Sequence, residues 1–309
     1  MSNVVGDKPS FTLVRGENYL ALPRDPQPWL VDKLVPSGGV MLVGGAPKEG
    51  KSFMALGIAV AIANPQCTSF LGRDVLKHGP VIYLQVDTPR EEWASRIERI
   101  KGEGIDNIYW SDANLVPYPL TITDGAIKYA LTQKLRELHP VLLVVDTLRE
   151  VHNDDENDNT AMKRVITALV EVTRETNTTL LMVAHTRKHN AVKRGEEYEI
   201  NLVDDIRGAN YVAGRCDIIS IMSKGRFILT GRSIGNKAYA VEQNPLTLLW
   251  GMKDSTVEIG AALDYVMQAP ELKNADDRLA MLMAQVPTLS KDDAIERMQS
   301  WKPKPKPTS

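Results

Sequence analysis

The sequence predicts an α/β fold built on a mostly parallel, twisted sheet with helices on both faces. Continuous apolar runs of strand length recur in the first 185 residues, and such runs are typical of strands buried on both faces; they lie at residues 40–43, 81–86, 141–146 and 179–184. Segments with helical periodicity separate these runs, at residues 53–63, 90–101, 124–138 and 160–176. Strands and helices that alternate in this way are typical of βαβ units.

The composition favours a cytoplasmic protein over a membrane-spanning or secreted one, and it lacks the overall basic charge of an obligate nucleic-acid binder. The formal net charge is −2 and the pI is about 6.3, which is not the global basic signature of an obligate nucleic-acid binder. Contact with DNA would therefore depend on local basic patches. Cys67 and Cys216 lie far apart in the sequence and form no ligand cluster, which suggests a reducing compartment. No apolar run reaches the ~18–20 residues of a membrane span, and the polar start lacks a signal-peptide pattern.

Residues 1–37 are predicted to be a lead-in to the main domain. A short strand is expected at residues 11–14, and four prolines between positions 23 and 36 then interrupt regular structure. The α/β core is expected to span residues 38–254. Within it, residues 70–74 are expected to be a loop or hairpin, and residues 107–110 a short strand.

The pattern changes after residue 218. Apolar segments at residues 218–222, 227–230 and 246–250 predict strands of a meander, with a turn at Lys224-Gly225. Three helical segments at residues 256–267, 276–285 and 291–301 predict a small helical C-terminal appendage over residues 255–301. Residues 302–309 alternate Lys and Pro, which predicts a disordered tail.

The most informative stretch is a glycine-rich loop between the first buried strand and the first long helix. Its spacing is G-x-x-x-x-G-K-S, and the helix continues with Phe53; the loop residues are Gly45, Ala46, Pro47, Lys48, Glu49, Gly50, Lys51 and Ser52. Backbone N–H groups of such a loop wrap a phosphate, and the helix N-terminus adds a positive dipole end. Lys51 is expected to reach the β- and γ-phosphates, and Ser52 to hold Mg²⁺. An ordinary strand-to-helix turn does not explain why Lys and Ser follow the second glycine.

Three further polar residues fall at the ends of buried strands. Asp146 ends the run at residues 141–146, where it would bind Mg²⁺ opposite Ser52, although any such Asp can also cap a helix. Asp87 ends the run at residues 81–86 and is a candidate to polarise the attacking water, or an N-cap of the next helix. His185 ends the run at residues 179–184 and is a candidate γ-phosphate sensor, or a strand-end histidine held by hydrogen bonds. Ligand groups of parallel sheets gather at such ends.

Two basic groups complete the set of candidates. A polar stretch begins at residue 187 and extends to residue 206, and its basic half is expected either to face nucleic-acid phosphates or to be a solvated loop. Arg232 and Lys237 lie at a strand end late in the core. In a ring or filament, Arg232 could reach the γ-phosphate of a neighbouring subunit.

Together these residues resemble the RecA-like ATPases, and most closely the hexameric replicative helicases of the RepA type and related phage DNA-recombination ATPases. The resemblance covers roughly residues 28–250. It rests on the phosphate loop, the strand at residues 81–84 with its acid and Pro89, and five later segments, which are Asp146-Thr147-Leu148-Arg149, the acidic stretch 154–157, residues 184–188, residues 205–208, and Arg232 with Lys237.

The resemblance implies ATP and Mg²⁺ as cofactors and assigns roles to residues. It implies that Lys51 binds phosphate, Ser52 and Asp146 hold the metal, His185 is the sensor and Arg232 the finger in trans, with Lys237 beside it. It also implies contacts to single-stranded DNA from the loop, with Arg187, Lys188, Lys193, Arg194 and Arg207 as candidates. The family usually has Glu where this chain has Asp87, which is one methylene shorter. That departure predicts slow hydrolysis, or help from another acid such as Glu91.

Three functions follow as hypotheses. The first is an ATP hydrolase that assembles into a ring, a hexamer by the resemblance, and moves on single-stranded DNA as a replicative-type helicase. The second is a recombinase or strand-annealing ATPase that forms helical filaments on single-stranded DNA. The third is a nucleotide-switched regulatory protein without DNA activity. The resemblance places the protein in a bacterial, plasmid or phage context.

Overall fold

A nine-stranded mixed sheet forms the centre of the computed structural model, which describes residues 13–23, 28–86, 88–112, 116, 120–156, 158–186, 209–253, 263, 265–270, 272–285 and 291–301. The strand order is β13-β12-β11-β10-β3-β9-β8-β6-β7. The six strands from β10 to β7 are parallel, and β11, β12 and β13 extend the sheet in antiparallel fashion. The predicted α/β class with a mostly parallel sheet is therefore confirmed.

The parallel strands are apolar on both faces because helices cover both faces. They are β3 (Val40–Gly45), β6 (Val81–Gln85), β7 (Ile108–Trp110), β8 (Leu142–Asp146), β9 (Thr179–His185) and β10 (Ile218–Ser223). Apart from a few residues at strand ends and in β7, their side chains are buried.

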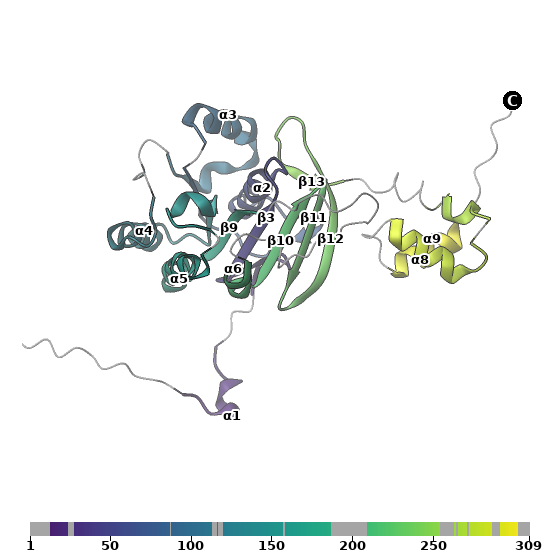
Figure 1. The fold of residues 1–309 in the computed structure, drawn as a ribbon, viewed down its shortest axis with the longest axis horizontal. Helices are drawn as coiled ribbons and strands as arrows, with labels where there is room; N and C mark the ends of the chain where they lie inside the picture. The colour runs from purple at the N-terminus through teal and green to yellow at the C-terminus, as the bar shows by residue number, and fades with distance from the viewer. Residues whose placement is uncertain are drawn as a thin grey trace, which may run out of the picture.

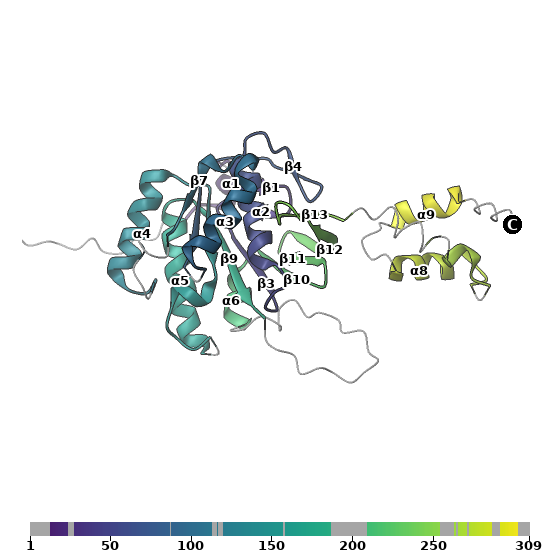
Figure 2. The ribbon, with the colours of Figure 1, turned by 90° about the horizontal axis from the view of Figure 1, so that it is seen from above.

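Helices α2 (Lys51–Ala63) and α3 (Arg90–Ile100) cover one face, and α4 (Gly125–Leu138), α5 (Asn159–Glu175) and α6 (Ala209–Arg215) cover the other (Figure 1). Helix α2 is buried along almost its whole length, which explains why its sequence is apolar all round rather than amphipathic. Figure 2 shows α2 and α3 in front of the strands.

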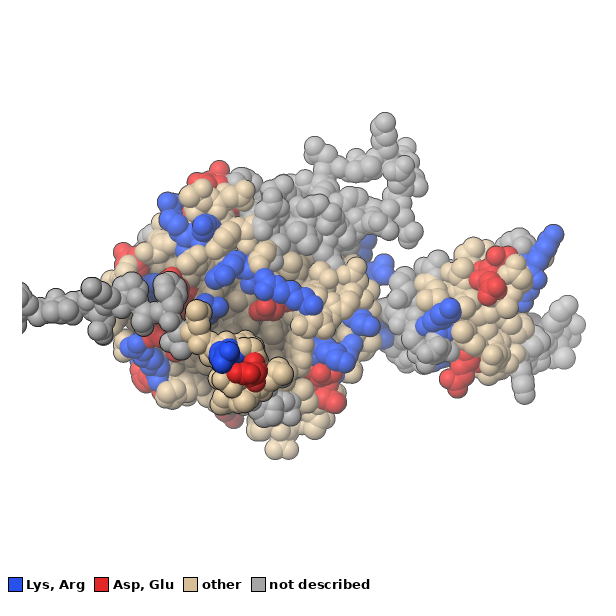
Figure 3. Space-filling view, turned by 90° about the horizontal axis from the view of Figure 1, so that it is seen from below, with Lys and Arg blue, Asp and Glu red and all other residues tan. Residues whose placement is uncertain are grey.

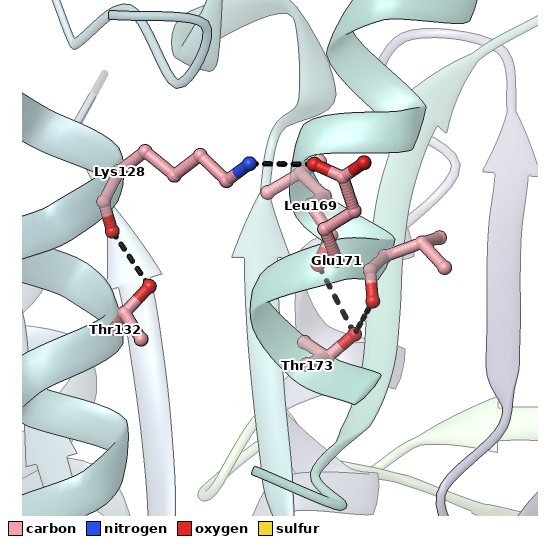
Figure 4. Close-up of polar contacts among 6 residues, drawn as sticks. Lys128, Thr132, Leu169, Glu171 and Thr173 are labelled. Carbon is pink, nitrogen blue, oxygen red and sulfur yellow. Dashed lines mark hydrogen bonds and ion pairs between the residues drawn. The ribbon is translucent and has the colours of Figure 1, made fainter. Parts of the chain in front are cut away.

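Helices α4 and α5 lie side by side beneath the sheet, and an ion pair joins them across their exposed edge (Figure 4). Lys128 Nζ lies 2.5 Å from Glu171 Oε2. The hydroxyl of Thr132 donates to Lys128 O in α4 at 2.8 Å, and that of Thr173 donates to Leu169 O in α5 at 3.1 Å. Each hydroxyl donates to a carbonyl oxygen on the preceding turn of its own helix. Its burial therefore leaves no donor without a hydrogen bond and costs little free energy of folding.

The antiparallel extension corrects the sequence-based expectation in two places. β11 (Arg226–Gly231) lies near its predicted position, but β12 (Ile234–Gln243) is a ten-residue strand where only the end of a strand was expected. The strand predicted at residues 246–250 is wrong, because residues 245–247 form a turn and β13 is only Trp250–Met252. The Asn244 side chain accepts hydrogen bonds from Leu246 N and Thr247 N, and Leu248 adopts φ +63°, so the chain turns here despite its apolar composition.

The remaining elements lie outside the main sheet. β1 (Trp29–Val31) pairs with β2 (Val35–Pro36), and β4 (Ser69–Phe70) pairs with β5 (Arg73–Asp74), so of the loop or hairpin expected at residues 70–74 the structure has the hairpin. Among the residues that the structure describes, short 3₁₀ helices occur at Lys101–Glu103, Ile105–Asn107 and Leu148–Val151. Of the strand expected at residues 11–14, only Leu13 and Val14 are described, and they precede the short helix α1 (Gly16–Tyr19).

Helices α8 (Ala275–Gln285) and α9 (Lys291–Ser300) form a separate cluster (Figure 1). They pack around Leu263, Val266, Leu282 and Ala294. Most of the helix predicted at residues 256–267, and the tail at residues 302–309, lie outside the described residues. The domain boundaries therefore remain predictions. None of the described helices is both long enough and apolar enough to cross a membrane.

Candidate nucleotide-binding site

The glycine-rich loop connects β3 to α2 at the carboxyl edge of the parallel strands. Two of its glycines are required by the backbone and by close neighbours. Gly45 has φ +155°, and a Cβ atom there would lie 2.7 Å from Met222 O of β10. Gly50 has φ +80° as the N-cap of α2, and a Cβ atom there would lie 2.5 Å from the ring of Trp250. The loop is thus tightly enclosed by strands from much later in the chain.

Lys51 is the first residue of α2, and its ammonium group folds back over the loop. The side chain is almost fully buried, Nζ donates to Ala46 O at 2.9 Å, and His185 Nδ1 lies 3.3 Å away. Burial lowers the pKa of Lys51 below its ordinary value, while the negative charges of Asp146 and Glu49 oppose that shift. An anionic phosphate would satisfy this buried cation.

Ser52 and Asp146 lie together beside the loop. Ser52 Oγ donates to Asp146 Oδ1 at 3.0 Å, and Asp146 is 3% exposed at the end of β8. The second oxygen of this carboxylate, Oδ2, accepts a hydrogen bond from Tyr83 OH at 2.7 Å. Since the Ser52 hydroxyl has one proton and two lone pairs, it can donate to Asp146 and still offer a lone pair to a cation.

The pair suits Mg²⁺, which prefers oxygen ligands and keeps several waters and substrate phosphates in its shell. Among the described residues, no group of three or more His, Cys, Asp and Glu side chains is arranged to hold a metal ion. A site made from one hydroxyl and one carboxylate beside a phosphate loop does not need such a group.

A cavity of about 530 Å³ opens above the loop. Its phosphate end is formed by the loop itself with Lys51, Ser52, Thr147 and His185. The rest of its lining, which we call the aromatic end, is formed by Phe53, which directly follows the loop, and by three side chains distant in sequence, namely Arg96, Gln243 and Trp250. The cavity therefore combines a polar end with an aromatic end, as a nucleotide requires.

Two contacts define the aromatic end. Trp250 Nε1 donates to Gly50 O at 3.0 Å, which fastens β13 onto the start of α2. The Arg96 guanidinium of α3 lies 5.1 Å from the centre of the Phe53 ring. Sequence reasoning identified Phe53 but missed Trp250, Gln243, Arg96 and Thr147. Of these only Thr147 carried a local signal, because it follows the predicted metal-side acid.

The structure brings together four of the predicted residues, Lys51, Ser52, Asp146 and His185. The register explains why. Gly45 on β3 pairs with His185 on β9, and Asp146 on β8 pairs with Val183 on β9, so the strand ends converge at one edge. Thr186 N also donates to Gly45 O at 3.2 Å. The histidine ring is half-buried and lines the cavity.

Arg232 and Lys237 lie away from the cavity of their own chain. Arg232 follows Gly231, whose partner Ile218 pairs with Met41 near the start of β3. Arg232 is thus near the amino edge, about 13 Å along the strand direction from the loop. There Arg232 Nη2 donates to Gly214 O at 2.7 Å. Lys237 is exposed on β12 opposite Leu229.

Six predicted residues lie outside the described part of the chain. Asp87 follows Val86, two positions beyond Gln85, which pairs with Asp146. The other five belong to the candidate DNA-contacting loop, and they are Arg187, Lys188, Lys193, Arg194 and Arg207. Their roles stay predictions.

Comparison with known proteins agrees with this geometry. The model of the AAA_25 family, described as an AAA domain, matches residues 8–191. No curated protein sequence matches the chain at a significant level.

Two solved structures illustrate the likeness. A DnaB-like replicative helicase, solved to describe its interactions with primase, superposes with a TM-score of 0.52 at 14% identity, covering 70% of this chain and 58% of that one. This chain thus spans little more than half of that helicase. A second structure, of an isolated ATPase domain, superposes with a TM-score of 0.53 at 14% identity, covering 71% of this chain and 86% of that one. At this identity the likeness shows the shared fold, which is RecA-like.

Proposed function

Because the chain belongs to the AAA_25 family of AAA domains, a family of P-loop ATPases, we propose that it hydrolyses ATP in order to move on or remodel single-stranded DNA. The observation that carries the proposal is the convergence of Lys51, Ser52 and His185 on one cavity that Phe53 and Trp250 also line, with Asp146 hydrogen-bonded to Ser52 beside it.

The geometry suggests how the residues act on ATP. Backbone N–H groups of the loop and the Lys51 ammonium hold the phosphates, while Ser52 and Asp146 would hold Mg²⁺. A Mg²⁺ ion held there would supply positive charge that stabilises the negative charge developing on the transferred phosphoryl group. His185, 3.3 Å from Lys51 Nζ, is placed to respond to the γ-phosphate. The base would lie at the end of the cavity formed by Phe53, Arg96, Gln243 and Trp250.

Two parts of the proposed reaction depend on more than the described site. Asp87 would polarise the attacking water from a position just beyond β6. Arg232 would supply transition-state charge to a neighbouring subunit, since it lies too far from its own phosphate loop to serve that loop. The active form would therefore be an assembly with sites between subunits, either a hexameric ring or a filament.

DNA contact is proposed for the basic residues after β9. That strand ends at His185, 3.3 Å from Lys51 Nζ of the phosphate loop, so movement of His185 on loss of the γ-phosphate would displace the residues that follow it. A broken band of Lys and Arg side chains also crosses the face opposite α2 and α3 (Figure 3). It offers phosphate contacts despite the net charge of −2.

The primary test is Lys51→Ala, with exposed Lys134→Ala on α4 as the matched control. ATP turnover with and without single-stranded DNA would be measured for both variants. We expect Lys51→Ala to abolish turnover and Lys134→Ala to preserve it. Unchanged turnover in Lys51→Ala would refute the site.

The second test addresses DNA. Lys193→Glu combined with Arg194→Glu should remove the stimulation by single-stranded DNA and leave basal turnover intact. If wild-type protein shows no stimulation, and its DNA binding ignores nucleotide, the DNA part of the proposal fails and a nucleotide-switched regulator becomes the better explanation.

A filament-forming recombinase or annealing ATPase is the alternative, and it is favoured by Asp at position 87, where the shorter acid suits slow hydrolysis. Negative-stain images with an ATP analogue and single-stranded DNA separate the two forms. Closed rings support the helicase, and long filaments support the alternative. A rise in turnover for Asp87→Glu would also favour slow hydrolysis as the natural state.

A further inference from the structure

Tyr83 lies in the middle of β6 and has no assigned role in nucleotide chemistry. Its side chain is completely buried, and its hydroxyl lies 2.7 Å from Asp146 Oδ2 and 3.2 Å from Ser52 O. A phenol has one proton to donate. The shorter contact, to an ionised acceptor, is the stronger one, so the proton is directed mainly at Asp146.

With this contact, each oxygen of the Asp146 carboxylate has a hydrogen-bond donor. Oδ1 accepts from Ser52 Oγ at 3.0 Å and Oδ2 accepts from Tyr83. Because Asp146 is 3% exposed, bulk water cannot easily replace the tyrosine hydroxyl. Hydrogen bonds to both oxygens fix the plane of the carboxylate.

The tyrosine ring is itself held in place. Its centre lies 5.2 Å from that of Trp93 on α3 and 5.6 Å from that of Trp110 on β7. These two rings also contact each other at 5.8 Å in an edge-on arrangement. An aromatic group held by two elements cannot swing away, so its hydroxyl is a fixed point against which Asp146 is oriented.

We propose that Tyr83 is a positioning residue for the metal–nucleotide site, which deepens the proposed function and rests on it. By fixing Asp146, Tyr83 keeps Oδ1 directed at Ser52, so that the Ser52 hydroxyl donates its proton to the acid and presents a lone pair to Mg²⁺. Loss of the phenolic hydroxyl removes the hydrogen bond that holds Oδ2 in this plane. The metal-dependent part of nucleotide binding should then weaken, while the phosphate contacts of the loop stay in place.

The test is Tyr83→Phe, which removes one oxygen atom and keeps the ring. Calorimetric titration would give the affinity for ADP in EDTA and in Mg²⁺. We expect the affinity in EDTA to stay within about twofold of wild type. The gain in affinity that Mg²⁺ confers should fall by about tenfold, the scale typical of groups that orient a metal ligand. The Mg²⁺ concentration for half-maximal turnover should rise in parallel.

Thr173→Val is the matched control, because it removes another buried hydroxyl that donates to a carbonyl, on α5 away from the cavity (Figure 4). Thermal denaturation of both variants reports the general cost of losing a buried hydroxyl. A Mg²⁺ gain equal to wild type in Tyr83→Phe would overturn the proposal, and so would an equal loss in both variants.

Failure of the inference is distinguishable from failure of the proposed function. If the inference alone is wrong, Lys51→Ala still abolishes binding and Tyr83→Phe behaves as wild type in both titrations. If wild-type protein binds no ADP in either buffer, the proposed function fails, and the assignment of Tyr83 fails with it.

Discussion

Gly50 shows how much a single residue controls at this site. It adopts φ +80°, which side chains rarely tolerate, and the indole of Trp250 occupies the space where a Cβ atom would lie. Its carbonyl also accepts the Trp250 Nε1–H bond. The same atoms therefore set the start of α2, the shape of the loop and the position of the aromatic end of the cavity.

We predict that Gly50→Ala lowers stability by about 1–3 kcal/mol through backbone strain and the clash with the indole. It should also weaken ADP binding by far more than the loss of folding stability explains, since Trp250, which lines the cavity, must move. Denaturant unfolding and ADP titration measure the two quantities.

Gly125→Ala is the control for this prediction. Gly125 is the first residue of α4, and nothing lies within 4 Å of its hypothetical Cβ atom. Alanine there should be neutral or slightly stabilising. If both alanine variants behave alike, the argument from Trp250 is wrong.

The two cysteines give a second prediction at this scale. Burial raises the pKa of Cys216 to about 12, and burial also raises that of the half-buried Cys67 above its ordinary value. The thiolate is the reactive form and its fraction grows with pH, so both residues should react more slowly at pH 8 than a free cysteine. A thiol reagent should label Cys67 slowly in native protein and Cys216 only after unfolding. Mass spectrometry of labelled peptides checks this, and rapid native labelling of Cys216 would contradict the burial described.

The residues at the phosphate end were predictable because their signals are local. The loop pattern and the polar residues at strand ends depend on short spacings, and parallel strands carry those ends to one edge. Trp250 and Gln243 were not predictable, because they reach the cavity only through an antiparallel extension whose register no local pattern encodes. The role of Tyr83 was not predictable for a related reason. A tyrosine within an apolar strand carries no functional signal until the structure shows Asp146 of β8 beside it.

At the scale of elements, the buried parallel strands and β11 were well predicted, whereas the antiparallel strands β12 and β13 at the edge of the sheet were not. β12 contains Gly235 and Asn236, and several of its residues are exposed, so it has neither an apolar run nor a strict alternation. The backbone hydrogen bonds of its pairing with β11, from Arg226 to Gly231, stabilise the extended conformation that its composition does not favour. Tertiary context thus overrides weak propensity at the sheet's edge.

Helix α5 offers a test of local stabilisation. Asp158 is its N-cap, and its side chain accepts from Thr160 N at 2.8 Å and Ala161 N at 3.3 Å. Asp158→Ala should lower stability by about 1 kcal/mol, as loss of a cap usually does. Denaturant unfolding measures the change.

The Lys128–Glu171 pair is the comparison for that helix. Its side chains are 35% and 58% exposed, so a double-mutant cycle should give a coupling well below about 1 kcal/mol. We thus expect the N-cap to stabilise α5 more than the ion pair does. A coupling energy larger than the stability loss caused by Asp158→Ala would contradict this.

At the scale of the whole molecule, the cavity links nucleotide to global stability. A ligand that binds only the folded chain stabilises it by about 2.7 kcal/mol at one hundred times its dissociation constant. We predict that Mg²⁺ with ADP at that concentration raises the free energy of unfolding of the core by this amount. Lys51→Ala should abolish the shift and Lys134→Ala should keep it. A shift that persists in Lys51→Ala would mean that the nucleotide binds elsewhere.

The fastening of β13 onto the phosphate loop has a consequence for biosynthesis. A nascent chain that has just completed the loop lacks β10, whose Met222 carbonyl packs against Gly45, and lacks Trp250, whose indole contacts Gly50 two hundred residues earlier. Translation must therefore continue past residue 250 before the nucleotide cavity can close. Ribosome-bound chains stalled before that point should fail to retain nucleotide, although they already carry every residue of the loop.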